Sequence, residues 1–278
     1  MAMKTILTVT SPDHGDADLK LAATLCEEIE AHLAVLVLNL AAPPPIGGYA
    51  AIVSDAWLQE RQADVERLRK RTAAVSALLA ASPISSDVSS EYPEEIWADE
   101  VIGRRARYAD MTVIGPELLC RRVLKDKIVS GTLFSSGKPL LLVPPGSFPT
   151  LRPKRVVVAW DSSVEASNAM ARSLDLLRTA EEVRLVLVDP VEGEFGQGEE
   201  PGADAATYLA RHGIKVTVDR RPSQGKSIAA VLRQHAIDTS AQLLVMGAYG
   251  HSRLSERILG GVTKTMIDEP PLPILMAR

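Results

Sequence analysis

Cysteine and aromatic residues are scarce in this chain. Two of its 278 residues are cysteines, Cys26 and Cys120, and aromatic side chains make up 4% of the sequence. Two cysteines cannot build the disulfide framework of a small secreted domain, and this usage is typical of a reducing compartment. Because hydrophobic residues still make up 46%, we expect two domains with cores of valine, leucine, isoleucine and alanine.

Long apolar runs and a strong net charge are missing as well. No stretch approaches the roughly 18 consecutive apolar residues that a membrane-spanning helix requires. The start, MAMKTILTVTSPDH, lacks the apolar block and the cleavage site of a signal peptide. The formal net charge of −4 provides no electrostatic footprint for nucleic acid or an anionic membrane. We therefore expect a cytoplasmic protein that binds neither.

Familiar catalytic and metal-binding patterns are also lacking. The five histidines contain no pair at metal-ligand spacing, so we expect no metal site built from protein ligands. Residues 224–227 (QGKS) imitate the end of a P-loop, but Arg220 replaces its first glycine, and Ser227 is better explained as a helix N-cap. No motif brings an acid, a base and a nucleophile together, so we expect no enzyme.

The chain contains two copies of one pattern. Residues 4–10 (KTILTVT) and 33–40 (LAVLVLNL) are β-rich runs with helical periodicity between them, which indicates a βαβ unit. At a constant offset of 150, residues 154–160 (KRVVVAW) and 183–190 (VRLVLVDP) repeat both runs. The segment 144–153 between the copies is rich in proline and reads as a linker.

Each copy predicts five mostly parallel strands with helices on both faces, which is a doubly wound, Rossmann-like α/β sheet. The fourth strands end at Gly115 and Gly247, and the fifth strands read PLLLVP and PILMAR. We accordingly place the domains at residues 1–145 and 154–278. In such open sheets, ligands bind beyond the carboxyl ends of the strands, where the strand order reverses.

Two inserts distinguish the copies. Residues 58–79 of the first copy have apolar positions at heptad-like spacing and predict a long amphipathic helix. This helix either covers one face of the sheet or serves as a lid or partner surface. Residues 191–204 of the second copy are acidic and glycine-rich, so we expect a mobile loop that could gate a neighbouring site.

The most informative stretch is residues 244–267, LVMGAYGHSRLSERILGGVTKTMI, in which the glycines follow the spacing G-x2-G-x9-G-G. Glycines let a backbone bring its N–H groups within about 3 Å of phosphate oxygens, and the start of the predicted helix at 258–267 favours an anion. A tight strand-to-helix connection without a ligand is the alternative. The glycines and cationic residues expected at this site are Gly247, Gly250, His251, Arg253, Gly260 and Gly261.

This stretch resembles the nucleotide-binding signature of universal stress proteins, where G-x2-G-x9-G followed by serine or threonine holds the phosphates of ATP. Gly247, Gly250 and Gly260 match in register, but Gly261 stands where the family has its hydroxyl residue. Glycine keeps the backbone N–H and removes one side-chain contact to phosphate. Thr263 cannot be assumed to replace that contact, because two residues correspond to about 200° around a helix.

The resemblance implies a tandem universal stress protein whose two halves pack as a pseudo-dimer. Its second domain would bind ATP or a related adenine nucleotide, accompanied by Mg²⁺. Asp161 in VAWDSS matches an acidic residue that contacts the nucleoside in the family, although carboxylates at strand ends are also common helix caps. In the first half, Ser11 replaces Asp161 and no glycine loop follows Gly115, so this domain would be a degenerate structural partner.

The function implied by the resemblance is a stress-response protein in which nucleotide occupancy alters a surface for a protein partner. Two alternatives stay open: an interaction scaffold that binds no nucleotide, and an enzyme, such as a weak ATPase, acting on a phosphorylated or adenylated small molecule. The final strand, PILMAR, would be exposed and could pair two chains as a homodimer.

Overall fold

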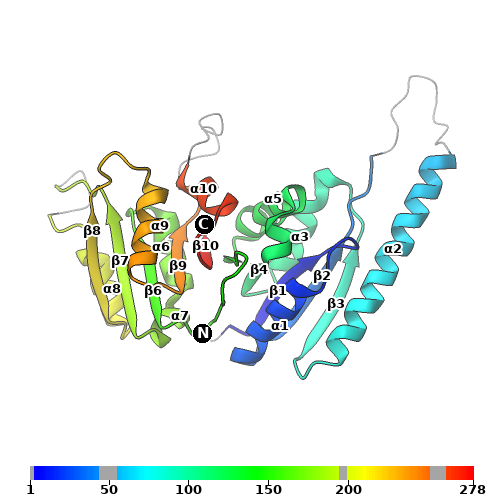
Figure 1. Cartoon of the computed structure of the whole chain (residues 1–278), viewed down its shortest axis with the longest axis horizontal. Coiled ribbons are helices and arrows are strands. Elements are labelled where there is room, and N and C mark those ends of the chain that lie inside the picture. Colours follow the sequence, from blue (N-terminus) through cyan, green and yellow to red (C-terminus); the bar gives the residue numbers. More distant parts are fainter. Residues whose placement is uncertain (1–2, 44–54, 194–198, 251–260) are drawn as a thin grey trace, which may run out of the picture. The chain divides into compact units, whose positions relative to one another are not determined.

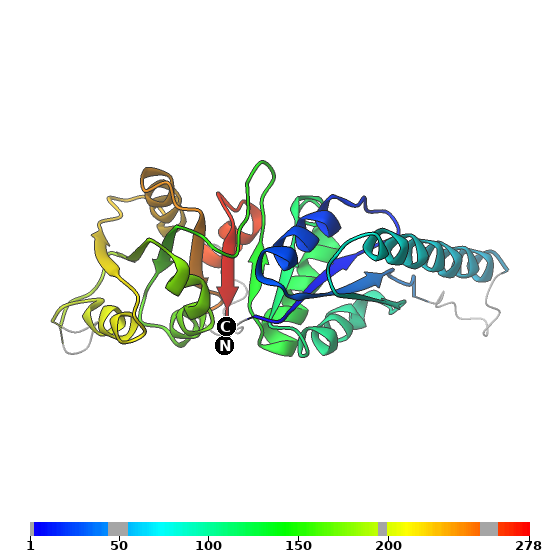
Figure 2. The same cartoon turned by 90° about the horizontal axis from the view of Figure 1, so that it is seen from below.

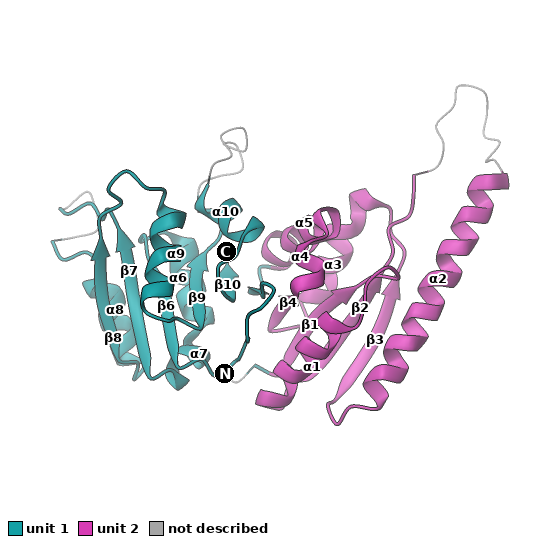
Figure 3. Ribbon diagram, viewed as in Figure 1, with its two compact units in different colours: residues 1–3, 137–278 teal, residues 4–136 magenta. Residues whose placement is uncertain are grey.

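The computed structural model, drawn from two sides in Figure 1 and Figure 2, describes residues 3–43, 55–193, 199–250 and 261–278. The chain divides into two compact units, which are coloured separately in Figure 3. Lys4–Ser136 is called the N-terminal unit, and Gly137–Arg278 together with Met3 is called the C-terminal unit.

The N-terminal unit has a parallel sheet with the strand order β3-β2-β1-β4. Its strands are β1 (Thr5–Thr10), β2 (His32–Leu38), β3 (Ser86–Glu91) and β4 (Met111–Ile114). Its helices are α1 (Ala17–Ile29), α2 (Asp55–Ala80), α3 (Ala98–Ala106), α4 (Pro116–Leu119) and α5 (Arg122–Ser130), with a 3-10 turn at Glu95–Trp97 and a π-helix at Gly131–Ser136.

The C-terminal unit has the strand order β5-β10-β9-β6-β7-β8, and all of its strands are parallel except β5. Its strands are β5 (Leu140–Leu142), β6 (Arg155–Ala159), β7 (Glu182–Val188), β8 (Val216–Arg221), β9 (Leu243–Gly247) and β10 (Ile274–Ala277). Its helices are α6 (Val164–Arg172), α7 (Leu174–Thr179), α8 (Ala203–Arg211), α9 (Ile228–Asp238) and α10 (Val262–Asp268).

This architecture confirms the predicted Rossmann-like α/β fold and the internal duplication. The strand β1 begins at Thr5 and β6 at Arg155, while β2 begins at His32 and β7 at Glu182, so both pairs keep the offset of 150. Strand β5, the fifth of the first copy, pairs antiparallel with β10, Leu141 lying opposite Leu275. For this reason the division between the compact units precedes β5 instead of falling in the proline-rich linker.

The expectation of an exposed final strand is wrong. All four residues of β10 are buried, and the strand pairs with β9 on one side and with β5 on the other. Both rows of backbone hydrogen-bonding groups are therefore engaged within the C-terminal unit, and β10 offers no free edge to a second chain.

The long helix expected at residues 58–79 is confirmed as α2, which packs along β3 and β2 (Figure 1). It buries Leu68, Val75 and Leu79 on one face and leaves most of its remaining surface exposed. Three buried aliphatic side chains contribute about 1.5–3 kcal/mol each to the packing of this polar helix on the sheet. The role of covering one sheet face therefore accounts for the spacing of Leu68, Val75 and Leu79, whereas Leu58 and Val65 of the same pattern are exposed.

The cores are aliphatic, as the composition predicted, and Cys26 is part of one of them. Burial raises the pKa of the Cys26 thiol to about 12, so the thiol stays protonated and unreactive. Cys120 is exposed. In the part of the chain that the structure describes, no helix combines the length and the apolar character needed to cross a bilayer.

A polar cluster lies between β7, β8 and α9, in which His235 is buried and Asp219 and Arg184 are partly exposed. The Asp219 Oδ2 atom lies 3.1 Å from Arg184 Nη1 and 3.1 Å from His235 Nε2, although the approach to His235 lacks the alignment of a hydrogen bond. Burial lowers the pKa of His235 below its ordinary value, while the charge of Asp219 acts in the opposite direction. The folded protein therefore favours the neutral imidazole at this position.

Candidate functional site

The site predicted from the glycine spacing lies at the carboxyl edge of the C-terminal sheet. The adjacent strands β6 and β9 are parallel, Val158 pairing with Val245, so both end at this edge. The strand β7 lies on the other side of β6, and the direction of strand order therefore reverses between β6 and β9. This is the position at which open α/β sheets bind their ligands.

Gly247 ends β9 and packs against the first turn of α6. A Cβ atom at this position would lie 2.5 Å from the backbone nitrogen of Ala166 and 2.7 Å from the carbonyl carbon of Glu165. Both atoms belong to the backbone and cannot move aside without shifting the helix. Glycine is therefore required here by strand-to-helix packing, whether or not a ligand is bound.

The loop after β9 is held at both ends. The Ala248 N–H donates to the Ala277 carbonyl at 2.9 Å and so extends the ladder between β9 and β10. Tyr249 has a φ of 59°, which is uncommon for a residue with a side chain. Its N–H donates to the hydroxyl of Thr263 at 3.2 Å, which links the loop to the first turn of α10.

Gly250 faces the turn between β6 and α6. A Cβ atom at Gly250 would lie 3.4 Å from Glu165 Oε2 and 3.7 Å from the Ser163 hydroxyl oxygen. These are ordinary van der Waals distances or slightly shorter ones, so the missing side chain leaves a shallow space beside a carboxylate. Sequence reasoning did not single out Glu165, since a lone glutamate in the first turn of a helix is unremarkable.

Asp161 shapes the turn that faces this loop. Its Oδ1 atom accepts a hydrogen bond of 3.0 Å from the Ser163 N–H and one of 2.6 Å from the Ser163 hydroxyl. The same hydroxyl oxygen accepts from the Ala166 N–H at 3.1 Å and caps α6. Ser162 between them has a φ of 64°. Asp161 is exposed and at the predicted edge, and its observed partner is the capping serine.

Gly261 precedes α10 as its N-cap residue, with φ −67° and ψ 148° and no side-chain cap. A Cβ atom there would meet no described atom within 4 Å. The helix begins at Val262, and the expected earlier start at residue 258 lies outside the described residues. Three of the predicted site residues also lie outside the described residues, namely His251, Arg253 and Gly260. The same holds for residues 194–198 of the acidic insert.

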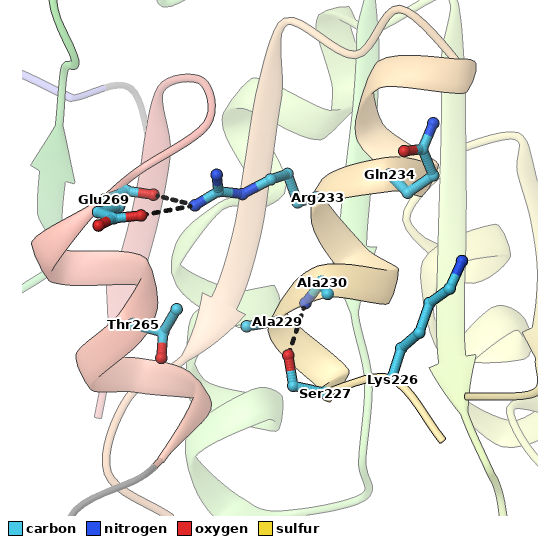
Figure 4. Close-up of a pocket in the computed structure, with 8 residues that line it drawn as sticks. All are labelled: Lys226, Ser227, Ala229, Ala230, Arg233, Gln234, Thr265 and Glu269. Atoms are coloured by element: carbon cyan, nitrogen blue, oxygen red, sulfur yellow. Dashed lines mark hydrogen bonds and ion pairs between the residues drawn. The ribbon is translucent and has the colours of Figure 1, made fainter. Parts of the chain in front are cut away.

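A groove of about 370 Å³ lies between α9 and α10 (Figure 4). Ser227 confirms its predicted role, because its hydroxyl oxygen accepts from the Ala230 N–H at 3.2 Å at the start of α9. Arg233 reaches across to Glu269, donating to its carbonyl oxygen at 2.9 Å and lying 3.6 Å from its carboxylate. An ion pair between α9 and α10 therefore crosses the groove, and Lys226 also lines it.

Residues 153–278, nearly all of the C-terminal unit, match the model of the universal stress protein family. These residues form a universal stress protein domain. The structure of a universal stress protein from Archaeoglobus fulgidus covers 98% of this chain and 96% of its own, with a TM-score of 0.66 and 17% sequence identity. A second structure, from Pseudomonas aeruginosa UCBPP-PA14 and described within the same family, covers 99% and 92%, with a TM-score of 0.53 and 14% identity.

At these identities the two structures show the fold alone, and both likenesses extend over the two units. The comparison with curated proteins gives no match. The resemblance drawn from the glycine spacing is therefore confirmed for the universal stress protein domain in the C-terminal half.

The corresponding edge of the N-terminal unit is filled by its own side chains. The Asp18 carboxylate, buried at the start of α1, accepts hydrogen bonds from the N–H groups of Glu117 and Leu118 at 3.1 and 3.0 Å. A Cβ atom at Gly115 would overlap with Asp18, and one at Gly15 would lie 2.7 Å from the Glu117 carboxylate. The backbone after β4 therefore donates to the Asp18 carboxylate. The equivalent position in the universal stress protein domain is the glycine loop after β9.

The helix α2 reinforces this closure. Arg71 donates to the Gly15 carbonyl at 2.6 Å and to the Asp16 carboxylate at 2.7 Å. The Arg71 side chain is only 13% exposed. Sequence reasoning missed both Asp18 and Arg71, because their partners are more than 50 residues away along the chain.

Proposed function

We propose that the C-terminal unit binds ATP or a related adenine nucleotide, and that the chain acts as a nucleotide-dependent regulatory or interaction protein in the stress response. One observation carries this proposal. The glycine loop after β9 lies at the carboxyl edge of the sheet, where strand order reverses, within a domain that matches the universal stress protein family. Tandem domains at 1–145 and 154–278, suggested by the repeat, complete the proposed organisation.

The open space beside two of the glycines supports the proposal of a phosphate site. At Gly250 an added Cβ would touch only side-chain atoms, and at Gly261 it would meet open space among the described atoms. Backbone N–H groups without a neighbouring side chain can approach anion oxygens closely. In the proposed complex the phosphates lie against Gly247, Gly250, Gly260 and Gly261, with His251 and Arg253 contributing positive charge and Asp161 near the nucleoside.

A divalent cation would accompany the nucleotide. The Glu165 carboxylate approaches Gly250, and Asp161 lies in the turn directly before α6. Two carboxylates beside a polyphosphate create repulsion that Mg²⁺ offsets, since it binds carboxylate and phosphate oxygens alike. We therefore propose that the chain binds the nucleotide as its Mg²⁺ complex.

Binding without rapid turnover is the proposed mode of action. Asp161 and Ser163, which carry the polar groups of the β6–α6 turn, hydrogen-bond to each other and cap a helix. Side chains engaged in this way hold a turn and are poorly placed to activate a water molecule. The N-terminal unit, whose edge is closed by Asp18 and Arg71, is proposed to be a structural partner.

The proposal is tested by the nucleotide content of the purified full-length protein. The protein is denatured, and the released small molecules are separated and identified by mass spectrometry. We expect close to one adenine nucleotide per chain in the wild type and none in Gly250→Glu, which places a second carboxylate beside Glu165. Thr207→Glu adds the same charge on the exposed face of α8 and should leave the content unchanged.

An empty wild-type protein that also shows no binding when titrated with MgATP would contradict the proposal. That result would favour an interaction scaffold in which the glycine loop serves only the packing seen at Gly247. Rapid Mg²⁺-dependent release of phosphate would instead favour an enzyme.

A further inference from the structure

The hydroxyl of Thr263 contacts the glycine loop. Thr263 is the second residue of α10, and its Oγ1 atom lies 3.2 Å from the Tyr249 nitrogen. The contact exists because the ladder bond from Ala248 to Ala277 fixes the strand end, and the loop then turns toward the start of α10. The angle of about 200° around the helix axis relates Thr263 to Gly261. It does not describe the path of the loop, which brings Tyr249 to Thr263.

The backbone at Tyr249 needs support of this kind. Its φ of 59° places a residue with a large side chain in the left-handed region, which costs of the order of 1 kcal/mol or more. The hydrogen bond that the Tyr249 N–H donates to the hydroxyl oxygen of Thr263 offsets that cost. Gly250, the next residue, is thereby held in one position relative to the turn at Ser163 and Glu165.

The same hydroxyl retains a proton to donate. In the contact with Tyr249 the oxygen of Thr263 is the acceptor, and a hydroxyl group has one hydrogen in addition to two lone pairs. Among the residues that the structure describes, no group accepts that hydrogen. A phosphate oxygen placed beside Gly250 would be a suitable acceptor.

We propose that Thr263 is a positioning residue of the glycine loop and supplies, to a phosphate group, the hydroxyl donor that Gly261 lacks. The second part of this statement rests on the proposed nucleotide binding, and the first part does not. Thr263 holds the loop at Tyr249 in the free protein. The ligand then binds a backbone that already has its binding conformation.

The first experiment uses no ligand. Amide hydrogen exchange of Tyr249 and Gly250 is compared in the wild type, Thr263→Val and Thr263→Ser. Valine has nearly the shape of threonine and lacks the hydroxyl, whereas serine keeps it. We expect the two amides to exchange roughly tenfold faster in Thr263→Val, which corresponds to the loss of one hydrogen bond, and near the wild-type rate in Thr263→Ser. Thr265→Val, two residues along on the exposed side of α10, is the matched control and should match the wild type.

The second experiment measures MgATP affinity by titration in the same variants. We expect Thr263→Val to bind roughly tenfold more weakly, because it loses a hydrogen bond to an anion, with Thr263→Ser restoring the affinity. Unchanged amide exchange in Thr263→Val would overturn the positioning role. A wild type that binds no MgATP would overturn the donor role and the proposed function together, while the exchange data would still decide whether Thr263 holds the loop. Wild-type affinity in Thr263→Val would overturn the donor role alone.

Discussion

The carboxylate of Asp18 accepts a hydrogen bond of 3.0 Å from the backbone N–H of Leu118, just after the end of β4. The Glu117 N–H donates a second hydrogen bond to the same carboxylate, so Asp18 is the acceptor for two adjacent backbone N–H groups. The C-terminal copy has Asn168 at the equivalent offset of 150, and this residue is exposed on α6. The equivalent strands β4 and β9 are thus followed by different structures. The backbone after β4 binds the buried Asp18 carboxylate, and the backbone after β9 forms an open glycine loop.

Replacing Asp18 should destabilise the N-terminal unit. Asp18→Ala leaves two N–H groups without their acceptor in a site where the residue is 5% exposed, and we expect a loss of about 2–4 kcal/mol in the free energy of unfolding. Asp18→Asn keeps one acceptor oxygen and should lose less. Urea unfolding of both variants measures these differences, and a wild-type stability for Asp18→Ala would show that the carboxylate is dispensable.

Restoring the family's hydroxyl at residue 261 should strengthen nucleotide binding. Gly261 has ordinary backbone angles and open space around its missing Cβ, so Gly261→Ser introduces no clash with described atoms. We expect MgATP affinity to rise roughly threefold to tenfold, from one added hydrogen bond, and stability to rise by a few tenths of a kcal/mol from the new N-cap. Gly261→Ala adds the methyl group without the hydroxyl. If alanine raised the affinity as much as serine, the hydroxyl would not be the cause.

Much of the fold was predictable from the sequence, since it depends on local patterns. The β-rich runs at residues 4–10 and 154–160 and the amphipathic helix α2 carry strand or helix signals in their local composition and spacing, which tertiary contacts then reinforce. The antiparallel pairing of β5 with β10 was missed, because a buried apolar run reads the same whichever neighbour it joins.

The candidate site was predictable only in part. Glycine spacing located the loop, yet it did not reveal that Gly247 is needed for packing against Ala166. The contact between Tyr249 and Thr263 and the one between Asp18 and Leu118 join residues 14 and 100 positions apart. Such pairs follow from the path of the chain in space, which local periodicity does not encode.

Removing the divalent cation should weaken nucleotide binding through Glu165. In the wild type we expect EDTA to lower ATP affinity at least several-fold, because the Glu165 carboxylate then faces unneutralised phosphate beside Gly250. Glu165→Gln should bind ATP better without Mg²⁺ and lose most of this dependence. Glu181→Gln, exposed at the start of β7 on the opposite edge, is the control. An equal effect of EDTA on wild type and Glu165→Gln would rule out the carboxylate as its source.

The buried imidazole of His235 should make stability depend on pH. Burial holds the pKa of His235 in the folded protein below 6.5, its value in the unfolded chain. The unfolded state therefore binds the proton more readily, and the contribution to stability is present above pH 6.5 and is lost as pH falls through the folded pKa. Asp219, Arg184 and Arg221 are the charged groups that act on this imidazole.

The check is the free energy of unfolding measured between pH 8 and pH 5 (about the range in which histidine titrates). We expect the wild type to lose more stability on acidification than His235→Gln, whose side chain does not titrate. His212→Gln, at a partly exposed position, should follow the wild type. Parallel curves for the wild type and His235→Gln would show that the buried imidazole does not contribute.

The stoichiometry of MgATP binding to the intact chain tests the central claim most directly, and calorimetric titration of the nucleotide-free protein measures it. An open glycine loop in the C-terminal unit and an edge closed by Asp18 in the N-terminal unit predict one nucleotide per chain, abolished by Gly250→Glu and unaffected by Asp18→Asn. Two nucleotides per chain would contradict the closure of the N-terminal unit. No binding at all would contradict the assignment of the glycine loop as a phosphate site.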